Sequence, residues 1–289
     1  MKCVSYNIQY GTGIDGKFDI ERIIDAVRGA DVIALQEVTR NSPMNGLRDL
    51  VADIRNLMPE YFAVYGPNLE AEVGSHVAEG KAVDVRMQFG NMILSKTPIM
   101  LSRNILLPRS RSYDRLNLQR GALEAVIDTP AGAVRFYSIH LDHRSPDERL
   151  RQVKFLMERV LHYPLEGGAI SGISEFGYPE PPAPEAFVLM GDFNMHEGTR
   201  EYAVIAGTPD EEFGPTWLAR FGVDAALLPV AEDGPRPTCV NTDDPADASR
   251  HERIDYCFVQ AALAGRVRSF RVDSAATGSD HKPIWLELE

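Results

Sequence analysis

The sequence predicts a mixed α/β fold in which β-sheets pack together and helices lie outside them. Two observations carry this prediction. Short apolar runs typical of strands alternate with helical stretches from the first residues onward, and several strand-like runs in the middle follow one another as hairpins do. Elements with one apolar face bury it by stacking in layers. No unit of about 20–50 residues recurs, which excludes a solenoid.

The first third of the chain alternates between strand and helix. Residues 2–8 and 31–35 are strand-like runs. Residues 19–28 are predicted to form a helix, because aliphatic residues recur there at helical spacing before Gly29. Ser42 and Pro43 offer a cap and a first-turn proline for a second helix. The apolar face of that helix consists of Leu47, Leu50, Val51, Ile54 and Leu57.

The rest of the chain is richer in strands. The predicted strands are residues 89–94, 122–128, 134–141, 187–190, 254–259 and 284–288. A capping box from Ser145 to Glu148, with Pro146 at the first helical position, opens a helix that runs to about residue 161. A short helix is predicted at residues 200–206.

Residues 163–184 are rich in glycine and proline and lie between a predicted helix and a predicted strand. Because strand signals continue on both sides, we expect a surface loop of one domain spanning residues 1–289, and not a linker between two domains. A loop of this length is often a lid or a substrate loop, and is sometimes merely mobile.

Composition and charge narrow the function. Hydrophobic residues make up 44% and charged residues 25%, as in globular proteins. The net charge of −12 disfavours tight, non-specific binding of DNA, which needs many basic side chains to displace counterions. Cys3, Cys239 and Cys257 are far apart and are expected to be buried, reduced thiols. With no signal peptide or membrane-spanning stretch visible, we expect a soluble, cytoplasmic monomer.

Several apolar strands end on side chains that can bind a metal or move a proton. These side chains are Asn7, Glu37, His140, Asp192 and Asn194. Each of them taken alone is more often a surface or structural residue. Five such endings, all with oxygen or imidazole groups, indicate instead a site where strand ends converge.

The sharpest motif is Gly191-Asp192-Phe193-Asn194. If this segment is extended, Asp192 and Asn194 point to one face and Phe193 points into the core. The carboxylate suits Mg²⁺, and the amide can hold a water or a phosphate oxygen. The alternative is an Asx-type turn after a strand, and the motif by itself favours neither interpretation.

A second motif, Ser279-Asp280-His281, precedes the last strand. Adjacent side chains of an extended segment face opposite ways, so the two serve different partners. The economical assignment places Asp280 on a metal and makes His281 a general base toward water. Such a histidine needs a second carboxylate to orient it, and Asp255 is the candidate. The alternative for Asp255 is a buried salt bridge with Arg253 or another arginine.

Seven strings of the sequence resemble the endonuclease/exonuclease/phosphatase superfamily, whose fold is that of deoxyribonuclease I. They occur in the family's order and span nearly the whole chain. The strings are Ser5-Tyr6-Asn7-Ile8, Leu35-Gln36-Glu37-Val38, Gly90-Asn91-Met92-Ile93-Leu94-Ser95, Ser138-Ile139-His140-Leu141, Gly191-Asp192-Phe193-Asn194, Arg253-Ile254-Asp255-Tyr256 and Ser279-Asp280-His281.

This resemblance implies a four-layer α/β/β/α sandwich and a hydrolase that depends on Mg²⁺ or Mn²⁺. It implies that Glu37 and Asp280 are metal ligands and that Asn7 lies close to the metal. The expected reaction is in-line attack of water on a phosphate ester, assisted by the metal.

The resemblance also implies roles for the other side chains. Asp192 and Asn194 would position the water and the phosphate. His281, oriented by Asp255, would assist the attack, and His140 would bind the phosphate and stabilise its developing charge.

Two departures from the family pattern concern substrate contacts. Some nucleases of the family pair the histidine at position 140 with a carboxylate. Here the nearby segment holds Gln88, and an amide in that place would make His140 less basic and a poorer general acid. After Glu37, only Arg40 offers a contact to phosphate.

The substrate is predicted from charge. The one dense basic stretch has Tyr113 within it and contains Arg103, Arg109, Arg111, Arg115 and Arg120. Arg111 and Arg115 are candidates for binding phosphate, although a solvated rim is equally expected. Given the net charge of −12, a small or single-phosphodiester substrate is favoured.

Other functions remain open because the fold does not choose among them. A nuclease acting on DNA or RNA and a sphingomyelinase-like phospholipid phosphodiesterase are the main alternatives. A non-catalytic binding module is a remote one, because every expected acidic and histidine position is filled.

Overall fold

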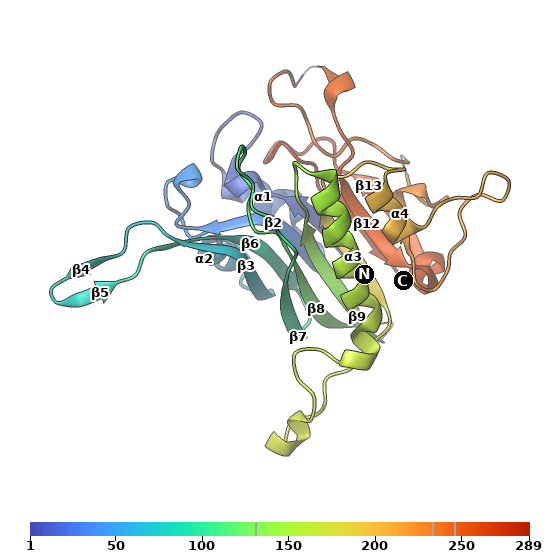
Figure 1. Ribbon diagram of the computed structural model, residues 1–289, viewed down its shortest axis with the longest axis horizontal. Helices are drawn as coiled ribbons and strands as arrows, with labels where there is room; N and C mark the ends of the chain where they lie inside the picture. Colours follow the sequence, from blue (N-terminus) through green and yellow to red (C-terminus); the bar gives the residue numbers. More distant parts are fainter. Residues whose placement is uncertain (131, 233, 246) are drawn as a thin grey trace.

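The computed structural model describes residues 1–130, 132–232, 234–245 and 247–289, and it contains two six-stranded sheets packed face to face (Figure 1). The first sheet has the order β13-β14-β1-β2-β6-β3 and the second β11-β12-β10-β9-β8-β7. The strands of the first sheet are β1 (Lys2–Asn7), β2 (Val32–Arg40), β3 (Phe62–Glu72), β6 (Arg86–Ser95), β13 (Val267–Val272) and β14 (Ile284–Leu288). Those of the second are β7 (Ile99–Leu106), β8 (Gly121–Thr129), β9 (Gly132–His140), β10 (Phe187–Asp192), β11 (Gly222–Asp224) and β12 (Asp255–Gln260).

Helices cover the outer face of each sheet. α1 (Ile20–Val27) and α2 (Leu50–Leu57) share one apolar cluster with the first sheet, where Ile23 and Ile54 pack with Ile33. α3 (Pro146–Glu166) and α4 (Arg200–Ala206) share a second apolar cluster with the second sheet, to which Leu156 and Ile205 belong. A third cluster lies between the sheets. The four-layer α/β/β/α prediction is therefore confirmed.

The strands missed by sequence analysis lie mainly at the sheet edges. β3, β7 and β13 are edge strands of the two large sheets. They contain both buried and exposed residues, because one side of an edge strand faces solvent. The short hairpin β4 (His76–Ala78) and β5 (Lys81–Val83) extends from β3 and β6 and protrudes from the molecule (Figure 1). In the part of the chain that the structure describes, no helix is long and apolar enough to cross a membrane.

The predicted start of the second helix, at Ser42, is wrong. A 3₁₀ turn over Pro43–Asn45 ends at Gly46, which adopts a left-handed conformation with φ 72°. α2 begins only at Leu50, where the Asp49 side chain accepts a hydrogen bond from the Ala52 N–H at 3.0 Å. Aspartate caps a helix in this way, and the chain restarts there.

The loop predicted at residues 163–184 begins later, because α3 continues to Glu166. Pro164 removes the N–H that would bond the Val160 carbonyl. The Arg135 guanidinium replaces it by donating to that carbonyl at 2.7 Å, so the helix continues and Tyr163 is buried. A proline inside a helix is tolerated when another donor satisfies the freed oxygen.

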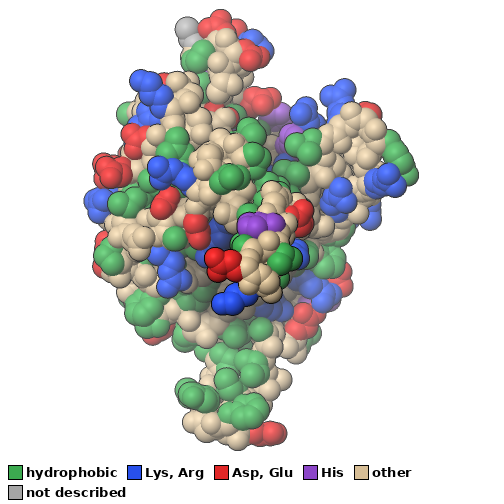
Figure 2. Space-filling model, turned by 90° about the vertical axis from the view of Figure 1, so that its left-hand side faces the viewer, with side chains coloured by type: hydrophobic (Ala, Val, Ile, Leu, Met, Phe, Trp, Pro, Cys, Tyr) green, Lys and Arg blue, Asp and Glu red, His purple; other side chains and the backbone are tan. Residues whose placement is uncertain are grey.

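Residues 167–184 lie at the far end of α3, at the bottom of the molecule in Figure 1. Hydrophobic side chains gather on this lobe in Figure 2, among them Phe176 and Tyr178, which are 75% and 64% exposed. α3 has 21 residues, which corresponds to about 30 Å of helix. The loop is therefore remote from the strand ends at His140 and Asp192, and it does not cover them.

Candidate active site

The predicted side chains meet at one edge of the two-sheet sandwich. β1 and β2 are parallel in the first sheet and β9 and β10 are parallel in the second, so the carboxyl ends of each pair lie together. β1 ends on Asn7, β9 on His140 and β10 on Asp192. β12 runs antiparallel to β10 and begins at Asp255, which pairs directly with Asp192.

Alternation along the strands explains why these side chains point between the sheets. On β1, Cys3 belongs to the apolar cluster between the sheets, Ser5 is two residues further and Asn7 two further again. β9 repeats the pattern with Phe136, Ser138 and His140. Side chains of a strand alternate in direction, so these three residues of each strand lie on the same side. On that side an apolar core residue is followed by a serine and then by the functional group.

A buried polar layer separates the apolar core from the site. Gln36 Nε2 donates to Ser138 Oγ at 2.9 Å, and Ser138 Oγ donates to the Leu35 carbonyl at 2.9 Å. Asn91 Nδ2 donates to the carbonyl oxygens of Gly121 and Ser138 at 3.0 and 2.8 Å. These bonds join the two sheets directly beneath the site, and they fix the spacing of the strand ends above it.

Glu37 reaches the site through a break in the regular strand. The pairing of β2 with β6 shifts register between Leu35 and Val38, and Glu37 has φ 61°. Alternation would turn Glu37 away from the side on which Gln36 lies. The bulge with positive φ redirects it, and such bulges and strained residues cluster at functional sites. Glu37 Oε1 lies 3.9 Å from His140 Nε2.

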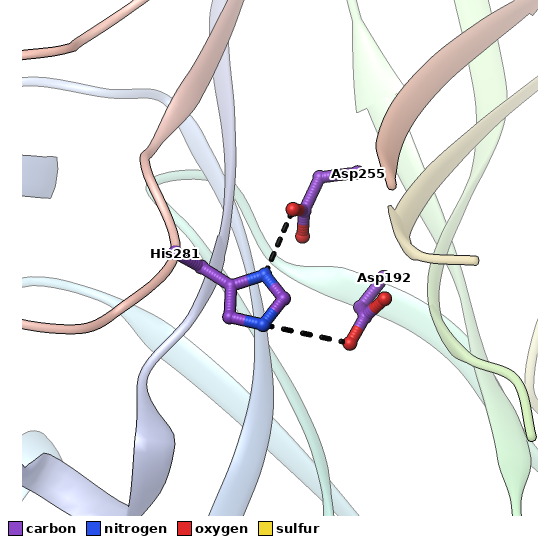
Figure 3. A group of neighbouring side chains, drawn as sticks. All are labelled: Asp192, Asp255 and His281. Carbon is purple, nitrogen blue, oxygen red and sulfur yellow. Dashed lines mark hydrogen bonds and ion pairs between the residues drawn. The ribbon is translucent and has the colours of Figure 1, made fainter. Parts of the chain in front are cut away.

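His281 bridges two carboxylates (Figure 3). Its Nδ1 lies 2.8 Å from Asp255 Oδ2, and its Nε2 lies 3.8 Å from Asp192 Oδ2 and 3.4 Å from Asn7 Nδ2. Asp192, Asp255 and His281 are close enough to be considered as one metal site. However, the two ring nitrogens point to different carboxylates, so the three side chains do not enclose one ion. The arrangement fits a histidine oriented by one carboxylate and facing a reaction centre with its other nitrogen.

The charges of Asp192, Asp255 and His281 act on one another. Burial opposes the charged form of His281, but the carboxylates of Asp255 and Asp192 outweigh it and raise the pKa of His281 well above its usual value. Burial raises the pKa of Asp255 to about 6, although the imidazolium opposes that shift. Despite its burial, Asp192 has a lowered pKa because His281, His140 and Arg120 stabilise its charge. His281 is thus a strong base held by ionised partners.

A segment that sequence analysis did not single out holds this pair in place. Thr238 Oγ1 accepts hydrogen bonds from the backbone N–H groups of Ile254 and Asp255 at 3.1 and 3.0 Å. The Val240 N–H donates to the Asp280 carbonyl at 2.8 Å, and Cys239 pairs with His281 as an isolated β-bridge. Thr238 and its neighbours therefore position both halves of the Asp255–His281 pair.

Asn7, Asp280 and Glu37 form a set of oxygen donors beside His281. Gln9 links two of them, because its backbone N–H donates to Asn7 Oδ1 at 3.1 Å and its Nε2 donates to Asp280 Oδ2 at 2.8 Å. Burial raises the pKa of Glu37 to about 7, and the charges of Asp280 and Asp192 add to this shift. The positive charges of Arg120 and His281 oppose this rise, but the pKa stays high, so a further cation would stabilise the ionised carboxylate. An all-oxygen donor set suits Mg²⁺ or Mn²⁺. The residues present therefore fit a divalent metal.

The segment Gly191–Asn194 forms an Asx-type turn, which was the alternative to an extended segment. The turn nevertheless lies in the site. The Asn194 N–H donates to Asp192 Oδ1 at 3.0 Å, and Asn194 has φ 50°. Its Nδ2 donates to the Leu141 carbonyl at 3.2 Å, while Phe193 is buried in the outer core. Gly191 has φ 152°, and a Cβ there would lie 2.0 Å from the Ile139 carbonyl oxygen. Only glycine allows β10 to approach β9 so closely.

His140 has partners different from those expected. Gln88 donates to Glu70 Oε2 at 2.5 Å, so its amide pairs across β3 and β6. His140 instead has its Nε2 3.3 Å from Asp192 Oδ2 and 2.7 Å from Arg120 Nη1. Burial and the charge of Arg120 lower the pKa of His140 to about 4. Gln88 is therefore not the partner of His140, and burial together with Arg120 makes the ring a weak base.

The arginines predicted to bind substrate make other contacts. Arg40 pairs with Asp49 at 3.0 Å. The guanidinium of Arg111 lies 4.8 Å from the Tyr113 ring centroid, and Arg115 lies 3.5 Å from Asp114. Arg111 and Arg115 belong to the loop between β7 and β8, which ends at Arg120. Of the basic stretch, Arg120 is thus the member that the fold brings to His140.

Comparisons with known proteins agree with this fold. The model of the Endonuclease/Exonuclease/phosphatase family matches residues 4–281. An endonuclease/exonuclease/phosphatase structure from Beutenbergia cavernae aligns with a TM-score of 0.67 and 21% identity, over 99% of this chain and 70% of that one. A counterpart from Bacteroides vulgatus gives 0.63 and 20%, over 100% and 98%. A mannosyl-6-phosphatase from Bacteroides thetaiotaomicron gives 0.63 and 16%, over 100% and 99%. No curated protein matches significantly in sequence.

Proposed function

Because the chain belongs to the endonuclease/exonuclease/phosphatase family, we propose that it is a divalent-metal-dependent phosphoesterase that hydrolyses a phosphodiester or phosphomonoester by in-line attack of water. The observation that carries the proposal is the bond between Asp255 and His281, which leaves His281 Nε2 facing Asp192 and Asn7. In its neutral form, an imidazole held in this way can take a proton from water, and Asp255 stabilises the resulting charge.

The metal would be held by Glu37 and Asp280, with Asn7 beside them. Bound there, a divalent cation would neutralise phosphate charge and make water easier to deprotonate. Asp192 accepts from Asn7 Nδ2 at 3.0 Å and lies between the two histidines, so it orients groups on both sides of the reaction centre. Its lowered pKa keeps it a hydrogen-bond acceptor throughout.

His140 acts as a neutral group in this proposal. With its pKa lowered to about 4, His140 is neutral at neutral pH and is a poor source of a proton. Its one N–H group can still donate a hydrogen bond. It therefore binds a phosphate oxygen by hydrogen bonding, and it does not serve as a general acid. Asn194, at the end of the adjacent strand, would contribute a second uncharged contact.

A small or single-phosphodiester substrate remains favoured. The net charge of −12 and the pairing of Arg40 and Arg115 with carboxylates leave few cations for a long polyanion. The exposed apolar side chains of residues 167–184 lie at the other end of α3, so they give no support to a lipid phosphodiesterase. The fold shared with a mannosyl-6-phosphatase makes a sugar phosphate a sensible member of any substrate panel.

A panel of phosphate esters tests this function. We expect hydrolysis of bis(p-nitrophenyl) phosphate, p-nitrophenyl phosphate or a sugar phosphate in Mg²⁺ or Mn²⁺, measured by released nitrophenolate or inorganic phosphate. A non-catalytic binding module would release neither product. No turnover of any ester with either metal would therefore contradict the proposal.

Salt dependence tests the substrate class. The kcat/KM for a small ester should change little between low and moderate NaCl, because the metal and uncharged groups hold it. Binding to duplex DNA should be weak with a shallow slope, since the slope of log affinity against log salt is about −0.9 per phosphate neutralised. The measurement compares a small ester and plasmid DNA at both salt concentrations. Efficient plasmid nicking with a steep salt dependence would contradict the small-substrate proposal and favour a nuclease. It would not contradict the proposed metal site.

A further inference from the structure

Arg120 is a buried cation at the edge of the candidate active site. It directly precedes β8, and its side chain is only 3% exposed. Gly121 pairs with His140 across β8 and β9, which places Arg120 beside the end of β9. The Arg120 N–H groups therefore point into the region where His140 and Asp192 meet.

The hydrogen-bond partners of Arg120 are two imidazole rings. Its Nη1 lies 2.7 and 3.1 Å from the two ring nitrogens of His140, and its Nη2 lies 2.8 Å from Nδ1 of His143. A neutral imidazole has one lone pair to offer, whereas a guanidinium has five N–H donors. At least three donors of Arg120 are therefore left without a good acceptor.

The structure shows this shortage directly. Arg120 Nε is buried and has no hydrogen-bond partner among the described residues. The same part of the chain contains no ion pair between Arg120 and a carboxylate; Glu37, Asp192 and Asp142 act on it only as more distant charges. A buried cation without an anion is costly, because desolvation is not offset by a close opposite charge.

The other two buried arginines of the described chain have oxygen acceptors for their terminal N–H groups, although Arg135 Nε, like Arg120 Nε, has no partner. Arg149 pairs with Glu201 at 3.2 Å and donates to the Asp142 carbonyl at 3.2 Å. Arg135 donates to the Tyr137 hydroxyl and to the carbonyls of Val160 and Glu185, at 3.0, 2.7 and 2.8 Å. Arg120 differs from both in having no oxygen acceptor, although it lies where a substrate phosphate would enter.

We propose that Arg120 binds the substrate phosphate, with its free N–H groups donating to two non-bridging oxygens while His140 and His143 hold the guanidinium in place. The planar guanidinium matches two phosphate oxygens, and such charge-assisted pairs are stronger than neutral hydrogen bonds. The inference rests on the proposed phosphoesterase function for the identity of the anion. Arg120 thus supplies a cation for the phosphate beside His140.

Binding of inorganic phosphate tests this assignment independently of turnover. Titrations by calorimetry in Mg²⁺-containing buffer would compare the wild type with Arg120→Gln and Arg120→Lys. Losing a charge-assisted contact should weaken phosphate binding roughly 10- to 100-fold in Arg120→Gln. Arg120→Lys should lose less, because it keeps the charge but not the planar pair of donors.

Arg103→Gln is the matched control. Arg103 also lies on the second sheet and is largely buried, but it pairs with Glu124 at 2.7 Å and is remote from His140 in the sheet. This variant removes the same charge and should bind phosphate within about twofold of the wild type, since binding effects of distant sites are usually small. Melting temperatures of all variants confirm that each is folded at the temperature of the titration.

Chemical rescue covers the case in which Arg120→Gln is poorly folded. Adding guanidinium ion at low millimolar concentration to Arg120→Ala should restore ester hydrolysis, whereas the same ion should not raise the activity of the wild type or of Arg103→Gln. Unchanged phosphate affinity in Arg120→Gln, or no phosphate binding by the wild type, would overturn the assignment. Phosphate binding that needs Arg120 in a protein that hydrolyses no ester would instead refute the proposed function and leave the anion site standing.

Discussion

Removal of divalent cations with EDTA is expected to abolish the hydrolysis of bis(p-nitrophenyl) phosphate, and Mg²⁺ or Mn²⁺ is expected to restore it. The physical reason is the cluster of oxygen donors at the edge of the sandwich. Burial raises the pKa of Glu37 to about 7, and the charges of Asp280 and Asp192 add to that rise. Without a cation these carboxylates repel one another, and the phosphate would meet the same repulsion. Full activity in exhaustively chelated protein would contradict the whole metal interpretation.

Thermal unfolding gives a second measure of metal binding. A cation that binds only the folded protein stabilises it by about 2.7 kcal/mol at a concentration 100 times its Kd. The pKa of Glu37, raised to about 7 in the folded chain, means that this group destabilises the metal-free fold increasingly as pH rises from its unfolded pKa toward 7. A cation relieves that cost and competes with the proton. The rise in melting temperature caused by Mg²⁺ should therefore be larger at pH 8 than at pH 5.5.

Glu37→Gln separates a bound metal from a general effect of salt. The amide has nearly the same shape but no charge, so we expect activity and metal affinity to fall by at least the roughly 10- to 100-fold seen when groups that support metal sites are removed. Asp128→Asn is the matched control, because Asp128 is exposed near the other end of β8. An equal loss in both variants would show that the cation does not bind through Glu37.

Much of the site follows from strand periodicity. Asn7, His140 and Asp192 each continue an alternation in which every second side chain faces the other sheet, so a polar group at the end of that series must emerge at the sandwich edge. The parallel pairs then bring the ends together, since α1 and α3 return the chain to start the next strand in the same direction.

Local pattern could not predict the orientation of Glu37 or the role of Arg120. Glu37 faces the site only because a bulge interrupts β2, and the sequence carries no glycine there to signal positive φ. Arg120 looked like one member of a basic stretch, whose other members Arg109 and Arg115 bond within their own loop. Its place beside His140 depends on the register of the β8–β9 hairpin, which pairs Gly121 with His140.

Contacts between distant segments also account for what was missed around His281. Thr238 stands in a stretch with no regular element, yet its hydroxyl binds the backbone at Asp255. A threonine in a loop has no sequence signature for such a role. The alternative of a salt bridge between Asp255 and Arg253 is not what forms, because Arg253 pairs with Asp224 at 2.6 Å.

His281→Ala is expected to lower kcat by roughly 10²–10⁴, the usual contribution of a positioned acid–base group. Asp255→Asn should fall in a similar range, because it removes the charge that orients and stabilises the imidazole. His281 is 7% exposed, so His281→Asn, which fills more of the space, checks that a cavity is not the cause of the loss. His162→Ala, on the exposed face of α3, is the control and should leave kcat unchanged.

The double variant decides whether Asp255 and His281 work as one unit. If Asp255 acts only through the imidazole, its charge has nothing left to orient once His281 is absent, and the double variant should be little slower than either single one. The bond of 2.8 Å between Asp255 Oδ2 and His281 Nδ1, two buried side chains, is the reason to expect such strong coupling. The measurement is kcat for a small phosphate ester in saturating Mg²⁺, with melting temperatures as a check on folding. Losses that add on a logarithmic scale would show instead that Asp255 and His281 act on the reaction independently.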